Sequence, residues 1–124
     1  MKTESIIVRK TYSFAIEIIV LYKHLVNVKR EFVLSKQLLR SGTSIGANVN
    51  EGVAAISKRD FVYKLSISVK EARETIYWLN LLRDSEYIDN IHFEKICNSC
   101  AEILRILNSI ILTTKKRYFN DTSL

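Results

Sequence analysis

The sequence has 124 residues, which is enough for one domain to bury an apolar core without disulfides or a structural metal. It contains no proline and only 3 glycines, a composition that excludes collagen-like repeats and Gly/Pro-rich linkers. The formal net charge of +6 at pH 7 favours acidic partners such as nucleic acid or an anionic membrane surface. We therefore expect one all-α domain that spans residues 1–124.

Apolar residues recur with the period of an α-helix and predict four helices, at about residues 5–28, 32–55, 58–85 and 90–117. The expected core stripe of the first helix is Ile7, Thr11, Phe14, Ile18, Leu21 and Leu25. The expected stripe of the second helix is Leu34, Leu38, Ile45, Val49 and Ile56. Because the connections are short, neighbouring helices must lie side by side in opposite directions. The pattern predicts an antiparallel up-down-up-down four-helix bundle.

Polar residues mark the ends of the third and fourth helices. Ser57 is a candidate N-cap of the third helix, with Asp60 in its first turn, and Asp89 or Asn90 is the candidate cap of the fourth. The cations of residues 115–117 suit the negative C-terminal end of the fourth helix.

The second helix carries small and polar residues that we interpret as a packing motif. Gly42 and Gly46 remove side-chain bulk, so another backbone must approach closely there to offset the cost of glycine in a helix. A polar row follows one flank and consists of Gln37, Arg40, Ser44, Asn48 and Glu51. No base, nucleophile or metal set accompanies the row, so we expect hydrogen bonds between helices rather than catalysis.

Several helices have more apolar residues than one core stripe needs. These are Tyr12, Ile16, Ile19 and Val20 in the first helix, Ile67, Trp78 and Leu81 in the third, and Ile106 and Ile110 in the fourth. Apolar surface of this kind usually marks an interface, so we expect a homo-oligomer. The alternative is that bulky neighbours such as Trp78 cover these residues within one chain.

No residue pattern indicates an enzyme. Cys97 and Cys100 form a C-x-x-C within a helix without a second ligand pair, and His24 and His92 are isolated, so we expect core packing and neither a metal nor a cofactor. No apolar run approaches the roughly 20 residues of a membrane span, and the N-terminus does not resemble a signal peptide. We expect a cytoplasmic protein with reduced cysteines, no membrane association and no small-molecule substrate.

The best candidate for binding is a stripe on the third helix. Helical spacing places Arg59, Tyr63, Ser66, Lys70, Arg73 and Tyr77 on one face. Basic groups can neutralise phosphates while tyrosines stack on unpaired bases, which suits single-stranded or looped RNA. A solvated basic face is the alternative interpretation, and the nearby Glu71 and Glu74 would weaken its positive potential.

Residues 38–41, the segment 44–52 (Ser-Ile-Gly-Ala-Asn-Val-Asn-Glu-Gly) and residues 57–61 together resemble a known family. It is the four-helix-bundle family encoded in intervening sequences of bacterial 23S rRNA genes, and the resemblance covers nearly the whole chain. Gly46 stands where many members have proline, so this helix should be straighter here. The resemblance implies a ring-forming homopentamer without catalytic residues. Related bundles that accompany diversity-generating reverse transcriptases bind nucleic acid through basic surfaces, which implies an RNA-linked role.

These observations lead to one prediction and one alternative. We expect a non-enzymatic homo-oligomeric bundle that binds RNA or DNA through Arg59, Tyr63, Lys70, Arg73 and Tyr77. The alternative is a protein interaction or scaffold module whose positive charge has no role in binding nucleic acid.

Overall fold

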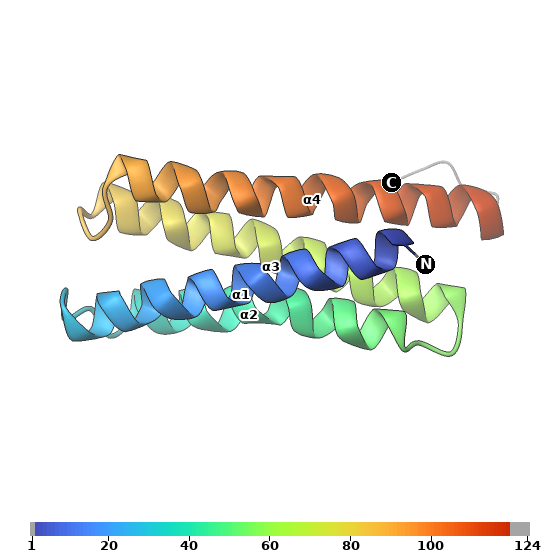
Figure 1. Cartoon of the computed structure of the whole chain (residues 1–124), viewed down its shortest axis with the longest axis horizontal. Helices are drawn as coiled ribbons and strands as arrows, with labels where there is room; N and C mark the ends of the chain where they lie inside the picture. Colours follow the sequence, from blue (N-terminus) through green and yellow to red (C-terminus); the bar gives the residue numbers. More distant parts are fainter. Residues whose placement is uncertain (1, 120–124) are drawn as a thin grey trace.

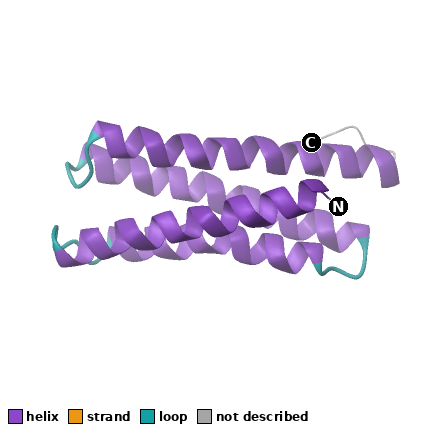
Figure 2. Ribbon diagram, viewed as in Figure 1, coloured by secondary structure: helices purple, strands orange, loops and turns teal. Residues whose placement is uncertain are grey.

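The computed structural model describes residues 2–119 and consists of long α-helices joined by short loops (Figures 1 and 2). In chain order these are α1 (Lys2–Asn27), α2 (Leu34–Val53), α3 (Lys58–Asp84) and α4 (Asn90–Tyr118), and the described range contains no strand. Successive helices run in opposite directions (Figure 1). The predicted all-α, antiparallel four-helix bundle is confirmed.

The helix starts follow local hydrogen bonds. The hydroxyl of Ser57 accepts a hydrogen bond from the Asp60 amide at 3.0 Å and caps α3. The carboxylate of Asp89 accepts one from the His92 amide at 2.8 Å and caps α4, which confirms one of the two candidates for this position. These caps satisfy backbone donors that have no partner within the helix.

The start of α2 depends on Glu31, a residue that the sequence pattern placed only in a connection. Its carboxylate accepts hydrogen bonds from the amides of Val33, Leu34 and Ser35 at 3.1, 3.0 and 2.6 Å. Burial raises the pKa of Glu31, but these backbone hydrogen bonds outweigh burial, and the pKa lies below its ordinary value. A charged carboxylate therefore closes the N-terminal end of α2.

The core confirms most of the predicted stripes. All six stripe residues of α1 are buried, as are Leu38, Ile45 and Val49 of α2. Leu34 is half-buried and packs against this core, whereas Ile56 is 100% exposed. The prediction for Ile56 was wrong since α2 ends at Val53, two residues earlier than expected, and the helical phase does not continue through the α2–α3 loop.

α2 packs closely on both of its neighbours, as its small residues predicted. A Cβ atom at Gly42 would lie 2.8 Å from Ile18 of α1, and one at Gly46 would lie 3.3 Å from the Thr11 carbonyl oxygen. On the other side, Ser68 of α3 donates a hydrogen bond to the carbonyl of Ile45 at 2.8 Å. Absent side chains therefore allow α1 to approach, and buried hydroxyls link α2 to α3.

The polar row of α2 bridges to α3 at two of its positions. Arg40 forms ion pairs with Glu71 and Glu74, and Glu51 accepts a hydrogen bond from Lys64 at 2.9 Å. Asn48, by contrast, donates to the carbonyl of Ser44 in its own helix. The expectation of bonds between helices is thus confirmed for Arg40 and Glu51 and wrong for Ser44 and Asn48, whose side chains donate to carbonyls of α2 itself.

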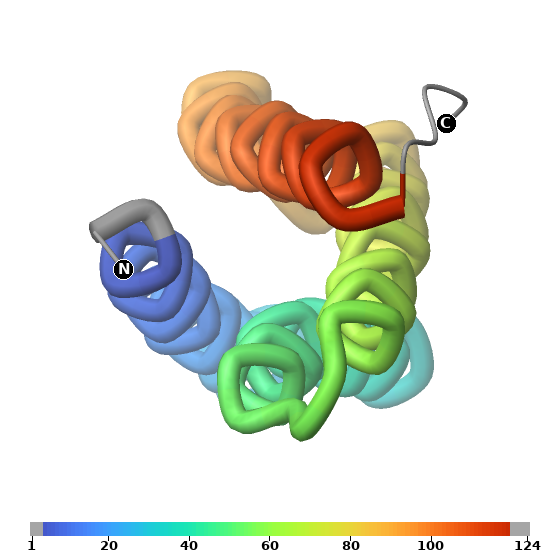
Figure 3. Tube along the Cα trace, turned by 90° about the vertical axis from the view of Figure 1, so that its right-hand side faces the viewer, coloured from blue at the N-terminus to red at the C-terminus, as the bar shows by residue number. Residues whose placement is uncertain are grey.

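The contact between α1 and α4 is the least extensive of the four between neighbouring helices. Figure 3 shows the order of the helices around the axis, with α2 and α3 on the far side from this seam. α1 exposes 66% of Tyr12, 46% of Ile16 and 63% of Val20 to solvent. The other surplus apolar residues are half-buried: Ile19, Ile67, Trp78, Leu81, Ile106 and Ile110. Neighbouring side chains of the same chain therefore cover much of this apolar surface, but they leave Tyr12, Ile16 and Val20 of α1 exposed.

α4 has the length and hydropathy of a membrane-spanning helix, contrary to the expectation that no segment comes near one. Cys100, Ile103 and Leu107 of this helix are buried in the bundle. A core helix has the same composition as a span, so this property is weak support for a membrane.

Candidate nucleic-acid interface

The five residues predicted to contact nucleic acid lie together on one face of α3. All of them are exposed: Arg59, Tyr63, Lys70, Arg73 and Tyr77. Buried residues of the same helix, such as Leu65 and Ala72, face the core instead. Because both sets follow the helical period, one helix separates a packing face from a solvent face. We call the exposed set the α3 stripe.

The two tyrosines of the α3 stripe present open ring surface. Tyr63 is 61% exposed and Tyr77 is 57% exposed. The Tyr77 ring packs edge-on against Trp78, with 5.1 Å between ring centroids and an angle of 70° between the planes. This contact limits the motion of Tyr77 while leaving ring surface available to a stacked base.

An arginine from α2 offsets the carboxylates beside the α3 stripe. The Nη2 atom of Arg40 lies 2.7 and 2.8 Å from the carboxylate oxygens of Glu74, and Nη1 lies 3.3 Å from Oε2 of Glu71. The hydrogen bond to Glu74 raises the pKa of Arg40, although burial acts against it. Glu71 and Glu74 are therefore engaged by Arg40, and neither pairs with Lys70 or Arg73 among residues 2–119.

The fold adds basic residues that the α3 stripe did not include. The start of α3 and the end of α4 lie at the same end of the bundle (Figure 1). Together they contribute Lys58, Arg59, Lys115, Lys116 and Arg117, which we call the bundle-end cluster. Sequence reasoning assigned residues 115–117 only to the helix dipole. The antiparallel order of α3 and α4 was the signal that could have joined them to residues 58–59.

Aromatic rings hold two cations of the bundle-end cluster. The Lys58 ammonium lies 4.9 Å from the ring centroid of Tyr118, and the Arg59 guanidinium lies 5.3 Å from that of Phe119. A hollow of about 160 Å³ opens beside Lys58. It is lined by Glu4, Lys58, Phe61, Ser109, Ile110, Thr113, Thr114, Arg117 and Tyr118. Cation–π contacts of this kind fix a side chain without removing its charge.

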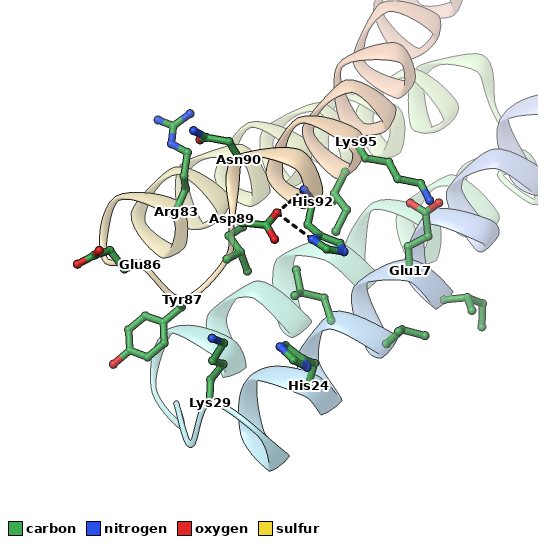
Figure 4. Close-up of a pocket in the computed structure, with 15 residues that line it drawn as sticks. Glu17, His24, Lys29, Arg83, Glu86, Tyr87, Asp89, Asn90, His92 and Lys95 are labelled. Carbon is green, nitrogen blue, oxygen red and sulfur yellow. Dashed lines mark hydrogen bonds and ion pairs between the residues drawn. The ribbon is translucent and has the colours of Figure 1, made fainter.

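A larger groove follows the seam at the opposite end of the bundle and measures about 1000 Å³ (Figure 4). Its apolar lining comes from Ile16, Val20, Leu21, Tyr87, Ile88 and Ile96. Its polar lining consists of Glu17, His24, Lys29, Arg83, Glu86, Asp89, Asn90, His92 and Lys95. In Figure 4, Lys95 of α4 points toward Glu17 of α1. The Oε2 atom of Glu17 is buried and has no hydrogen-bond partner in the described part of the chain.

The groove brings together the two histidines that looked isolated in the sequence. His24 comes from α1 and His92 from α4, and the Nδ1 atom of His92 lies 2.8 Å from the Asp89 carboxylate. The hydrogen bond from the His92 amide is the main cause that lowers the pKa of Asp89. The lining contains no serine, threonine or cysteine that could act as a nucleophile. Residues 2–119 also contain no cluster of three His, Cys, Asp or Glu that could hold a metal.

The C-x-x-C pair belongs to the packing of α4. Cys100 is buried, and its thiol donates a hydrogen bond to the Ala72 carbonyl of α3 at 3.4 Å. Burial raises the pKa of Cys100 to about 12, and burial also raises the pKa of the half-buried Cys97. A thiol that stays protonated and buried is unreactive and acts as a small apolar side chain.

The geometry can be compared with known proteins. A crystal structure of a protein of unknown function from the S23 ribosomal protein family of Bacteroides thetaiotaomicron VPI-5482 is 51% identical in sequence, with a TM-score of 0.87. The alignment covers 88% of this chain and 97% of that one. No functionally curated protein matches the sequence. Residues 3–109 match the 23S rRNA-intervening sequence protein family, and the chain belongs to that family.

Proposed function

We propose that this protein is a non-enzymatic, homo-oligomeric helical bundle that binds RNA or other nucleic acid through the α3 stripe. One observation carries the proposal: Lys70 and Arg73 lie exposed beside two open tyrosine rings, while Arg40 engages the adjacent carboxylates. Membership of a family described by 23S rRNA intervening sequences supports RNA as the partner.

The binding would combine electrostatic attraction with stacking. Lys70 and Arg73 would each neutralise a phosphate and release counterions, and Tyr63 and Tyr77 would stack on unpaired bases. Such contacts recognise a single strand with little preference for sequence. In a homo-oligomer, several copies of the α3 stripe would act on one polymer, so that weak contacts multiply into useful affinity.

A fluorescence anisotropy titration with a labelled single-stranded RNA tests this proposal. The double variant Lys70→Gln with Arg73→Gln should weaken binding at low salt and reduce the slope of log K against log salt by about 1.4, at roughly 0.7 per phosphate contact. The matched control is Lys23→Gln with Lys36→Gln, which removes the same charge from exposed positions on α1 and α2. Absence of RNA and DNA binding by the unmodified protein at low salt would refute the proposal.

Self-association would use the seam between α1 and α4. Tyr12, Ile16 and Val20 expose apolar surface along α1, and the last two line the groove at the seam together with other apolar residues. Contact with other copies would remove this surface from water. We propose a closed ring, with five subunits as the family resemblance implies, in the cytoplasm.

A protein interaction module is the second candidate function. The observation that favours it is the mixed apolar and charged groove of about 1000 Å³, which a segment of another protein could fill. A partner that stays bound after nuclease treatment, and that is lost with Val20→Asp but not with Lys70→Gln and Arg73→Gln, would support this function over nucleic-acid binding.

A further inference from the structure

We infer that the bundle-end cluster is a second phosphate-binding site, which holds single-stranded nucleic acid where it leaves the α3 stripe. This inference rests on the proposed function and extends the contact surface from one helix to the ends of two.

The cations of the bundle-end cluster lack carboxylate partners among the described residues. Elsewhere in the described residues, Lys10, Arg40 and Lys64 form ion pairs with Glu102, Glu74 and Glu51. No ion pair involves a member of the bundle-end cluster within residues 2–119. Among the described residues, the nearby acids are Glu4, which lines the hollow, and Asp60 in the first turn of α3. The five cations outnumber these two carboxylates, so the described residues at this end carry a net positive charge.

Aromatic rings restrain two of these cations. Lys58 and Arg59 lie over the rings of Tyr118 and Phe119, so their positions are restrained while their N–H groups stay available to phosphate oxygens. Tyr118 is itself 48% exposed and can stack on a base. Restrained cations beside an open ring reproduce, at the end of the bundle, the chemistry of the α3 stripe.

The α3 stripe and the bundle-end cluster are continuous. Arg59 belongs to both the α3 stripe and the bundle-end cluster, so the two surfaces share one edge. From Arg59 to Tyr77 the α3 stripe is about 27 Å long, at roughly 1.5 Å per residue. Lys58, the residue before Arg59, lines the hollow together with Arg117 and the hydroxyl-bearing Ser109 and Thr113. A strand that follows α3 toward its N-terminal end therefore arrives at the cluster.

The test uses two variants that leave the α3 stripe intact. The first is Lys58→Gln with Arg117→Gln, and the second is Lys116→Gln with Arg117→Gln, which keeps both cation–π contacts. The probes are labelled oligouridylates of two lengths, titrated over a salt series. Each variant should weaken binding of the longer probe at least tenfold at low salt and lower the salt slope by about 1.4. The control Lys23→Gln with Lys36→Gln should change affinity less than threefold.

The outcomes separate this inference from the proposed function. If the unmodified protein binds and the Lys70→Gln, Arg73→Gln variant is weakened, but both cluster variants behave like the control, this inference is wrong and the proposed function stands. If the unmodified protein binds no oligonucleotide, both are wrong. Equal thermal midpoints for all variants would show that loss of binding does not arise from unfolding.

Discussion

Gly42 of α2 lies directly against Ile18 of α1, and a Cβ atom at position 42 would stand 2.8 Å from both Cγ1 and Cγ2 of that side chain. Ile18 is fully buried, so it has little room to move away. Because Gly42 has no Cβ atom, α1 and α2 can approach each other closely at this position.

The variant Gly42→Ala should destabilise the protein. Helix propensity alone favours alanine by about 1 kcal/mol, but overpacking of a dense core costs about 1–3 kcal/mol. We expect a net loss in the free energy of unfolding, measured by urea denaturation. The double variant Gly42→Ala with Ile18→Ala should lose less than the sum of the single variants, because the second change makes room for the first. Strict additivity would contradict the close contact.

The carboxylate of Glu31 should make stability depend on pH. Its pKa is lowered in the folded state by the backbone hydrogen bonds, so its contribution is fully present above its ordinary pKa of about 4.3. This contribution is lost as the pH falls through the folded-state pKa. Glu31→Ala should cost about 1–3 kcal/mol near pH 7, since three backbone donors, of which the Ser35 amide is buried, lose their acceptor. The difference between the unmodified protein and the variant should shrink below pH 4; a difference that stays constant would refute the role of charge.

The two cysteines should differ in reactivity toward iodoacetamide at pH 8. Cys97 is half-buried, whereas the pKa of the buried Cys100 is raised to about 12, so almost none of its thiol is ionised. Mass spectrometry should find Cys97 modified roughly tenfold or more faster than Cys100 in the folded protein. Both should react alike in concentrated guanidinium chloride, which serves as the control. Equal rates in the folded state would show that Cys100 is accessible.

A charge at the seam should prevent self-association. Val20 is 63% exposed on α1 beside the groove, and Val20→Asp would place a carboxylate in the proposed interface. Light scattering should then report the subunit mass of 14.4 kDa, with helical circular dichroism unchanged. The matched control is Ile56→Asp, at a fully exposed apolar residue in the α2–α3 loop. A mass that Val20→Asp leaves unchanged would exclude this surface as the interface.

Much of the bundle could be predicted because its signals are local. Leu38, Ile45 and Val49 repeat with the helical period, so any helix at these positions turns them to the same side. Ser57 and Asp89 cap amides only three residues away, and such bonds need no other part of the chain. Ile56 was misplaced for the same reason, since periodicity carries no information once the helix has ended.

The candidate site could likewise be predicted only where it depends on local spacing. Periodicity along α3 was enough to place Lys70 and Arg73 on one exposed face. It could not show that Arg40 reaches across from α2 to Glu74, because that contact depends on the relative height of two helices. Nor could it show that the Glu31 side chain turns back onto α2, which requires the loop to pass through Arg30 in the left-handed region, at φ 58°.

Helix positions, core faces and the cationic face of α3 thus follow from spacing along the chain. In an α-helix, the number of residues between two side chains fixes the angle between them around the helix axis. Packing decided which faces meet. It brought Lys58 and Arg59 to the aromatic end of α4, placed His24 and His92 in one groove, and left α1 partly uncovered. These contacts join residues far apart in sequence. They depend on which helices pack against each other and on how far the helices are shifted relative to one another along their axes.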